Sequence, residues 1–517
     1  MSDGSEEIPS IGDWDRRVFL QLLGSAAVTG ATPAAAAARS SPDILNLSAV
    51  ALSTAIHAKR ISCVELMTAS LDRIDVLNPK VNAIVALQDR ATLLREAAAR
   101  DAMLARGESM GPLHGFPHAV KDLQPVKGLP HTEGSTIFRN RIATTDGLMV
   151  GRLRTAGVVF IGKTNTPEFG LGSHTYNAVY GTTRNAWNQD RSAGGSSGGA
   201  AVAVALRMLP LADGSDFGGS LRNPAGWNNV CGFRTSSGRV PNSPDQWIPS
   251  MGGVGPMGRT VADVGLLLSV IAGQDPAVPL SMESPAASFA GPLPINAKGK
   301  RIGWLGDFGG FAPCEPEVLA TCRKALGTFA TLGCSIDEAL PDYPLDKAWD
   351  TFVQLRGWMQ GGALLDHYRD PVRRAQLKPE ALFEVETGLK LSAFDITRLS
   401  AARSDYTRAF RKLFERFDFL VAPTAQTLAF DARLDWPREI AGHKMQTYHE
   451  WMKVCCLVTL AGCPSLAVPA GFAPGNQPIG LQIIAPVHQE LACLAMGAAF
   501  EAASGSTDRI PPLTASG

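Results

Sequence analysis

The chain has 517 residues, and its 48 Lys and Arg balance 48 Asp and Glu, so the formal net charge at pH 7 is zero. This balance argues against a nucleic-acid-binding protein, because such proteins use excess positive charge to release counterions from phosphates. It favours small polar or neutral ligands. The length exceeds the size at which a single core usually stops growing, so one large catalytic domain or two domains are both compatible with it.

The nine cysteines include the adjacent pair Cys455 and Cys456. They show no CxxC or zinc-ligand spacing, and their number is odd. We therefore interpret them mainly as small core residues, and we expect no metal site.

Residues 1–40 resemble an export signal. Arg16 and Arg17 precede a mildly apolar segment at residues 22–38, which ends in small residues near 35–38. This pattern predicts a twin-arginine signal and a periplasmic or secreted protein. The alternative is a disordered, alanine-rich leader on a cytoplasmic protein. No other stretch is long and apolar enough to span a bilayer, so no membrane partner is expected.

Past the leader, helix and strand signals alternate. Residues 43–79 carry apolar residues at helical spacing, including Leu66, Leu71 and Ile74, and predict a helical layer that Pro79 closes. Short apolar runs follow at residues 118–120, 157–165 and 209–216, and each ends in Gly or a polar residue. Strands alternating with helices predict an α/β fold, whose chemistry usually lies in loops at strand ends.

The sequence pattern changes between about residues 280 and 440, where patterns typical of charged amphipathic helices predominate. The apolar segment at residues 417–430 then resumes the sheet pattern. We expect a helical insert that covers the core and the substrate rather than an independent domain.

Two glycine-serine clusters stand out, at residues 194–198 and 216–220. Glycine costs conformational entropy on folding and buries no side chain, so a packed core alone does not account for them. The first cluster matches G-x-S-x-G, which would make Ser196 a nucleophile served by a later histidine such as His488. The second cluster can aim backbone N–H groups at a developing oxyanion. A phosphate-binding loop fits poorly, because no Gly-Lys-Ser/Thr follows either cluster.

Residues 194–241 and the segment GPLHGFPHAVKDL around Lys121 together resemble the amidase signature family. The similarity continues through KTNTPEFG, GPMGRTVADVGLLL, FLVAPT and the segment at residues 459–486, and so covers about residues 45–505. The resemblance implies an α/β fold with a large mixed central sheet flanked by helices on both faces. It also implies one catalytic domain at residues 41–517 that needs no cofactor.

The family's Ser-Ser-Lys triad falls on Ser220 as nucleophile, Ser196 as the bridging serine after a cis peptide bond, and Lys121 as base. Ser197 would then be a structural hydrogen-bonding residue. An exposed lysine is protonated at neutral pH, so the pKa of Lys121 must fall by roughly 2–3 units through desolvation. The flanking residues Ala119 and Val120 are compatible with that.

The resemblance also implies the groups that would hold the substrate. The backbone N–H groups that would bind the oxyanion belong to Phe217, Gly218, Gly219 and Ser220. We expect pocket walls from the loop at residues 169–171, including Gly170, and from the helical insert. Candidate apolar lining residues are Trp358, Met359, Trp436 and Trp451.

Three neighbouring features have plainer interpretations. Asp216 and Arg222 flank the nucleophile and are expected to form a structural ion pair. His118 and His131 are as compatible with capping or packing as with substrate binding.

The resulting prediction is an amide hydrolase that releases a carboxylic acid and ammonia or an amine. The expected partner is a small-molecule amide with an apolar or aromatic part, and a homodimer stays open as the assembly. One alternative is the glutaminase subunit of a tRNA-dependent amidotransferase, which the export leader opposes because tRNA charging is cytosolic. Another is a non-catalytic binding protein, which the intact set of Lys121, Ser196 and Ser220 opposes.

Overall fold

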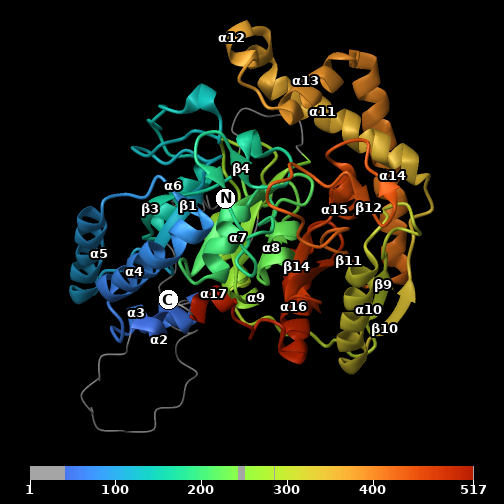
Figure 1. The fold of residues 1–517 in the computed structure, drawn as a ribbon. Helices are drawn as coiled ribbons and strands as arrows, with labels where there is room; N and C mark the ends of the chain where they lie inside the picture. Colours follow the sequence, from blue (N-terminus) through green and yellow to red (C-terminus); the bar gives the residue numbers. More distant parts are fainter. Residues whose placement is uncertain (1–40, 243–250, 284–285, 516–517) are drawn as a thin grey trace, which may run out of the picture. The chain divides into compact units, whose positions relative to one another are not determined.

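The computed structural model describes residues 41–242, 251–283 and 286–515. The predicted export signal at residues 1–40 lies outside these ranges. Two sheets organise the described chain: one of eight strands in the order β10-β9-β11-β15-β14-β7-β8-β6, and one of three strands in the order β1-β3-β2 (Figure 1).

The eight-stranded sheet is mixed. Strand β11 (Phe419–Pro423), the third in this order, runs parallel to β9 and antiparallel to β15, and β9 is also parallel to β10. All the other pairings in this sheet are antiparallel. The remaining strands are β6 (Leu211–Asp216), β7 (Cys231–Arg234), β8 (Gly253–Gly258), β9 (Arg301–Trp304), β10 (Ser335–Glu338), β14 (Ser465–Ala473) and β15 (Gln477–Ile484).

Both faces of this sheet are buried around β11, as the alternation along that strand shows. Phe419 and Val421 belong to one apolar core, whereas Leu420 and Ala422 belong to a second. Helices α9 (Val261–Ile271), α10 (Pro316–Thr331) and α16 (Glu490–Ser504) contribute buried residues to the first core. Helices α11 (Leu345–Arg369), α14 (Ala393–Arg416) and α15 (Lys453–Leu460) contribute to the second. The predicted mixed sheet with helices on both faces is confirmed.

The small sheet carries the lysine segment. Strand β2 (Pro117–Lys121) runs parallel to β3 (Val159–Thr164), and β1 (Ile84–Val85) pairs with β3 in the antiparallel direction. The Lys121 N–H lies 3.3 Å from both carboxylate oxygens of Asp213 in β6, so β2 is tied to the edge strand of the large sheet. The predicted apolar runs before Lys121, at 157–165, at 209–216 and at 417–430 all contain strands.

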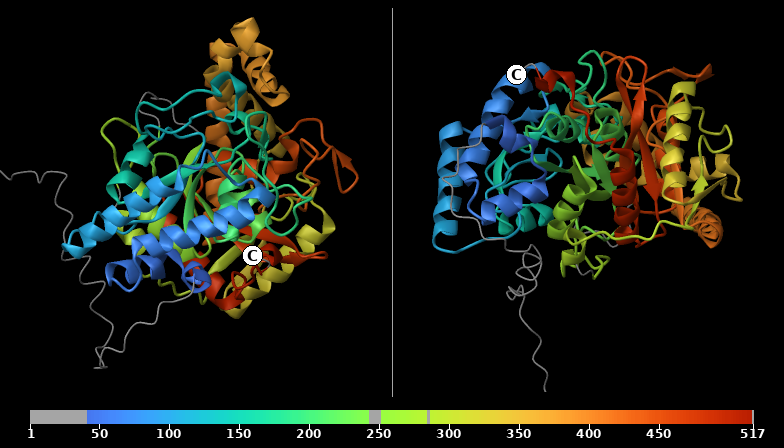
Figure 2. Two further views of the ribbon diagram at one scale, coloured as in Figure 1. Left: turned by 60° about the vertical axis from the view of Figure 1, so that its left-hand side comes forward. Right: turned by 90° about the horizontal axis from the view of Figure 1, so that it is seen from below.

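The N-terminal helical layer consists of separate helices rather than one long element. They are α2 (Ser41–Asn46), α3 (Ala49–His57), α4 (Cys63–Val81) and α5 (Arg90–Ala105). Ser48 and Ser62 each accept a backbone hydrogen bond as N-caps, so new helices start after them. Pro79 lies inside α4, which ends two residues later where Asn82 adopts a left-handed conformation. Figure 2 shows this layer (blue) on the opposite side of the catalytic unit from β9 and β10 (yellow).

Residues 280–440, for which the sequence predicted a helical insert, contain strands as well as helices. Residues 301–338 form β9, α10 and β10, a strand-helix-strand unit at the edge of the large sheet. These strands have only four residues each. β10 is largely exposed and ends in Asp337 and Glu338, so it gives little apolar signal, and the apolar part of β9 is limited to Ile302 and Trp304. The helical part comprises α11, α12 (Pro371–Arg374), α13 (Pro379–Leu389) and α14.

Helices α11 and α13 pack closely. A Cβ at Gly361 of α11 would lie 2.6 Å from the Glu384 carbonyl oxygen in α13, so a side chain at this position would force the two helices apart. Short elements complete the fold: α6 (Leu148–Thr155), α7 (Gly198–Ala205), α8 (Arg222–Asn228), α17 (Pro512–Ala515), β4 (Tyr176–Asn177), β5 (Gly181–Thr182), β12 (Glu439–Ile440) and β13 (His443–Lys444). No helix in the described ranges combines the length and the apolar character that crossing a membrane requires.

Candidate active site

Lys121 lies at the carboxyl end of β2 and is only 1% exposed. Its Nζ lies 2.7 Å from Ser196 Oγ, 2.9 Å from Ser197 Oγ and 3.0 Å from Ser215 Oγ. Burial lowers the pKa of Lys121 to about 7, although the negative charges of Asp213 and Asp216 act in the opposite direction. This lysine is therefore substantially neutral near pH 7.

The three hydroxyls give a neutral amine a complete set of partners. A neutral amine has two N–H donors and one lone pair, so it can donate to Ser197 and Ser215 while it accepts the proton of Ser196. Sequence reasoning assigned Ser197 its hydrogen-bonding role and missed Ser215. The available signal was period-two alternation, which places Ser215 on the same face of β6 as Asp213.

Ser196 stands in the turn that leads into α7, and the Gly195–Ser196 peptide bond is cis, as the family resemblance implied. Gly170 packs against this serine with a positive φ of 71°. A Cβ at Gly170 would lie 3.4 Å from Ser196 Oγ and 2.9 Å from Leu123 Cδ1. Glycine is needed here for both its backbone conformation and its lack of a side chain.

Ser220 lies between β6 and α8 and is 6% exposed. Its carbonyl oxygen accepts a hydrogen bond from the Ser197 N–H at 3.1 Å, which joins the two glycine-serine clusters. The prediction of four oxyanion donors needs a correction at Gly219. The Gly219 N–H donates to Asp216 Oδ1 at 2.8 Å, so the N–H groups left for an oxyanion are those of Phe217, Gly218 and Ser220.

The expected ion pair between Asp216 and Arg222 is present and fully buried. Arg222 Nη2 lies 2.9 Å from Asp216 Oδ1, and the same guanidinium donates to Gln482 and Thr459. Burial raises the pKa of Asp216, but Arg222 and then Arg234 outweigh it and hold that pKa well below its usual range. The pair therefore holds the Ser220 turn against β15 and α15.

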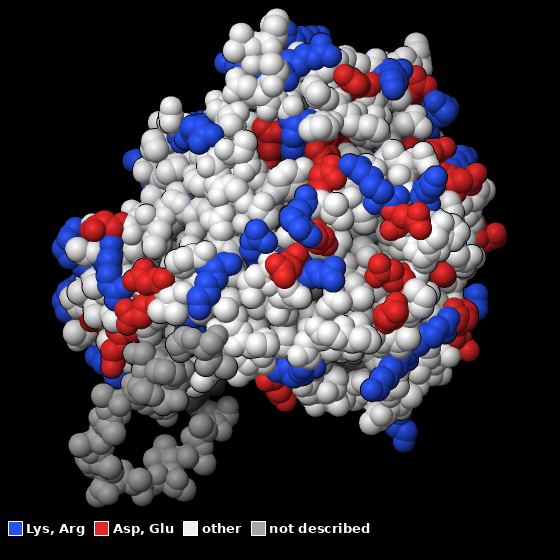
Figure 3. All heavy atoms as spheres, viewed as in Figure 1, with Lys and Arg blue, Asp and Glu red and all other residues white. Residues whose placement is uncertain are grey.

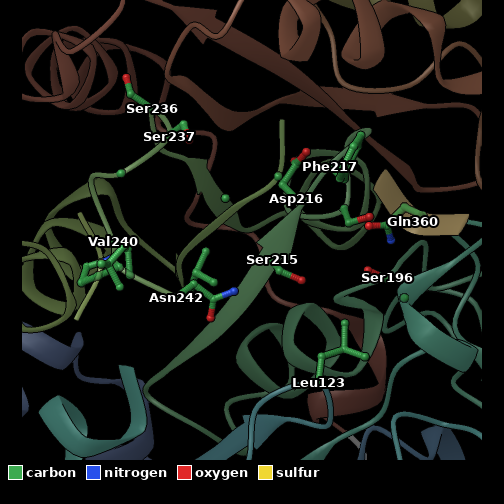
Figure 4. A pocket seen from close by; sticks show the side chains of 18 of the residues that line it. Leu123, Ser196, Ser215, Asp216, Phe217, Ser236, Ser237, Val240, Asn242 and Gln360 are labelled. Atoms are coloured by element: carbon green, nitrogen blue, oxygen red, sulfur yellow. The ribbon is translucent and has the colours of Figure 1, made fainter. Parts of the chain in front are cut away.

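The serines open on a pocket of about 260 Å³ (Figure 4). Its polar lining includes Ser196, Ser215, Ser220, Ser236, Ser237, Asn242, Arg356 and Gln360. Its apolar lining includes Leu123, Phe169, Phe217, Val240, Val254, Val278 and Leu280. Gly170 and Phe169 line the pocket as predicted, whereas Leu171 is buried in a separate apolar cluster.

The predicted apolar lining residues are not among those that line this pocket: they are Trp358, Met359, Trp436 and Trp451. Trp451, for example, stacks on Trp227 in the second core, with ring centroids 5.3 Å apart. Helix α11 instead presents Arg356 and Gln360, which flank the predicted pair Trp358 and Met359 in sequence. The composition of α11 alone did not show which face of the helix would line the pocket.

The geometry does not support the alternative in which Ser196 is a nucleophile served by a histidine such as His488. His488 is exposed, and its backbone N–H donates to Ser236 Oγ at 3.0 Å. In the described part of the chain, the titratable side chain that contacts the Ser196 hydroxyl is Lys121. His118 lies 3.0 Å from Asp213, and neither His118 nor His131 is among the described residues that line the pocket.

All nine cysteines are free and buried, in agreement with their interpretation as core residues. Within the described ranges, no group of three or more His, Cys, Asp or Glu side chains is arranged to hold a metal ion.

Comparison with known proteins identifies the class to which this fold and site belong. The family model for amidases matches residues 65–494. The chain therefore belongs to the amidase signature family. It is an amidase, an enzyme that acts on carbon–nitrogen bonds.

The similarity extends over nearly whole relatives. An acylamidase of Rhodococcus erythropolis is 36% identical over 473 residues, which are 90% of this chain and 97% of the relative. The A subunit of the glutamyl-tRNA(Gln) amidotransferase of Moorella thermoacetica is 34% identical, over 91% of this chain and 99% of that protein. The crystal structure of a bacterial aryl acylamidase superposes with a TM-score of 0.82 at 28% identity, covering 92% of this chain and 99% of that one.

Proposed function

We propose that this amidase hydrolyses carboxylic amides through an acyl-enzyme on Ser220 and releases a carboxylic acid and ammonia or an amine. The observation that carries the proposal is the 2.7 Å contact between a buried Lys121 and Ser196, in a pocket that Ser220 also lines. A lysine with a lowered pKa is a competent base near neutral pH.

Each step conserves protons. Neutral Lys121 accepts the proton of Ser196, Ser196 accepts the proton of Ser220, and Ser220 Oγ forms a bond to the amide carbonyl carbon. The N–H groups of Phe217, Gly218 and Ser220 stabilise the resulting oxyanion. Ser196 then returns a proton to the departing nitrogen as the C–N bond breaks.

Deacylation uses the same groups. Ser196, backed by Lys121, takes a proton from a water molecule that attacks the ester carbonyl of the acyl-enzyme. The bond to Ser220 Oγ then breaks, and this oxygen recovers a proton through Ser196. The enzyme returns to its starting state with the carboxylic acid as product.

The proposed substrates are amides with an apolar or aromatic part, with esters and carbamates as side reactions. The apolar wall supports this choice, since Leu123, Phe169 and Phe217 lie beside the serines in the pocket lining. The relatives named acylamidase and aryl acylamidase support it as well.

The second candidate is the glutaminase subunit of a tRNA-dependent amidotransferase. The relatives that carry the amidotransferase name, at 34% identity, favour it. Release of ammonia from glutamine by the isolated chain, at a rate comparable with the best simple amide, would support this candidate. Absence of that release would leave the stand-alone amidase.

A serine-reactive fluorophosphonate tests the proposed nucleophile. We expect mass spectrometry to locate the adduct on Ser220, and Ser220→Ala to abolish both the adduct and amide turnover. Ser196→Ala is the matched control, because it impairs turnover strongly while the Ser220 hydroxyl remains present. An adduct on Ser196 with Ser220 unmodified would overturn the assignment.

A further inference from the structure

Two polar side chains of helix α11, which the proposed mechanism does not use, line the pocket. Arg356 and Gln360 are four residues apart, so they lie on the same face of the helix. Gln360 lines the same pocket as Phe217 and Ser196, and Figure 4 labels all three. These two residues are therefore placed where a substrate at the serines would extend.

Arg356 is only 5% exposed, and hydrogen bonds hold its side chain in place. Its Nε donates to Glu384 Oε1 at 2.7 Å, and the same oxygen lies 3.0 Å from His449 Nε2 and accepts the Tyr448 hydroxyl. The guanidinium carbon stands 4.7 Å from the centre of the Phe217 ring. A fixed, nearly buried donor of this kind loses little conformational freedom when it binds a ligand.

Gln360 differs from Arg356 because the protein does not occupy its amide. It is half-buried, and no side chain or backbone group of the described residues forms a hydrogen bond with it. An amide that lines a pocket with its hydrogen-bonding groups free can donate to a carbonyl and accept from an N–H at once.

The charges around the pocket select a neutral ligand. Two charged side chains are among the described lining residues, Asp216 and Arg356. Each is already compensated by a buried partner, Asp216 by Arg222 at 2.9 Å and Arg356 by Glu384 at 2.7 Å. A charged ligand group would be buried against groups whose charges are already balanced, at a high desolvation cost.

We propose that Arg356 and Gln360 form a subsite for a second, neutral carbonyl group of the substrate, so that the preferred substrates are amides that carry another amide or ester carbonyl near the scissile bond. This inference rests on the proposed function, because it takes the scissile carbonyl to lie at Ser220. It adds a polar requirement to the apolar wall described above.

N-acetylglycinamide is the probe, because it contains two amides and its products reveal which one is cleaved. Ammonia release would place the second carbonyl in the acyl part, and acetate release would place it in the amine part. The isosteres in which an alkyl group replaces the whole second amide are 4-methylpentanamide for the first case and N-isobutylacetamide for the second. We expect kcat/KM for N-acetylglycinamide to exceed that of the matching isostere by about tenfold or more, because loss of the carbonyl leaves the subsite groups unpaired.

Gln360→Leu tests the subsite directly, since leucine has a similar size and no hydrogen-bonding group. We expect the ratio between probe and isostere to fall severalfold in this variant, because only Arg356 remains to bind the second carbonyl. Gln354→Leu is the matched control: the same substitution on the same helix, at a residue that does not line the pocket. The control should keep the wild-type ratio.

Two results would overturn the subsite. One is equal kcat/KM for probe and isostere in the wild-type enzyme, and the other is an unchanged ratio in Gln360→Leu. Fluorophosphonate labelling of Ser220, measured on the same preparations, separates this failure from failure of the proposed function. Turnover without reaction at Ser220 would refute the mechanism, whereas labelled Ser220 with an unchanged ratio would refute the subsite alone.

Discussion

Three serine hydroxyls surround the Lys121 amine. The number of protons on this amine decides which hydroxyls accept a hydrogen bond from it and which can donate to it. If Ser197 and Ser215 accept its two N–H groups, the lone pair is directed at Ser196. A protonated amine would instead have three donors and no lone pair, and the same three contacts would hold it inactive. The protonation state of one residue therefore determines whether this arrangement is a base.

Lys121→Ala tests this role. We expect turnover to fall by about 10²–10⁴-fold, the range typical of a lost general base, because alanine leaves Ser196 without a proton acceptor. His488→Ala should keep wild-type turnover, since His488 is exposed and its hydrogen bond to the pocket-lining Ser236 comes from its backbone N–H, which alanine retains. Amide hydrolysis by both purified variants is the measurement, and the opposite pattern would restore the histidine-served Ser196.

The pH dependence of activity follows from the same lysine. Burial lowers the pKa of Lys121 to about 7, so the neutral, active form predominates above pH 7 and the protonated, inactive form below it. We expect kcat/KM to rise about tenfold per pH unit up to that pKa and then to level off. A pH–rate profile between pH 5 and 9 checks this. Full activity at pH 5 would rule out a lysine base.

At the scale of elements, the turn between β6 and α8 depends on a buried charge pair. Asp216 ends β6, and Arg222 begins α8. The Asp216 carboxylate also accepts the N–H groups of Gly219 and Leu221, so it shapes the turn that holds Ser220. For this reason the N–H of Gly219, one of the predicted oxyanion donors, forms a hydrogen bond within the turn and is not left for an oxyanion.

Arg222→Met should therefore destabilise the protein by about 3–5 kcal/mol, because it leaves the Asp216 carboxylate buried without its partner. Arg398→Met is the control: Arg398 pairs with Asp395 at 2.7 Å, but its side chain is 68% exposed. Loss of such a surface pair costs about 0–1 kcal/mol. Urea unfolding curves of both variants are the measurement, and equal destabilisation would contradict the structural importance of the Asp216 pair.

Charges of both signs are interspersed over the face of the molecule shown in Figure 3, in keeping with the zero net charge and with a small neutral substrate. We propose that residues 1–40 direct export of the whole protein through a twin-arginine signal.

Replacement of Arg16 and Arg17 by lysine should retain the enzyme in the cytoplasm, because recognition of such a signal requires the arginine pair. Arg373→Lys with Arg374→Lys is the matched control, since these arginines are also adjacent and lie exposed in α12. Amidase activity in periplasmic and cytoplasmic fractions is the readout. Unchanged fractionation of the Arg16 and Arg17 variant would refute the export signal.

The sequence by itself determined the strands that end at the site, because apolar runs bounded by Gly or polar residues are local patterns. The set of Lys121, Ser196 and Ser220 came from the resemblance to the amidase signature family, since the local G-x-S-x-G pattern pointed instead to Ser196 with a histidine. The buried Asp216–Arg222 pair was predictable because its members are six residues apart.

Only the tertiary structure decided the features that depend on distant segments. Ser215 reaches Lys121 from 94 residues away, and Arg356 reaches Glu384 from a different helix. The pocket face of α11 could not be chosen from composition, so Trp358 and Met359 were predicted where Arg356 and Gln360 stand. The sequence of α11 is compatible with more than one rotation about the helix axis, and the packing of α11 on α13 and α14 determines which face lines the pocket.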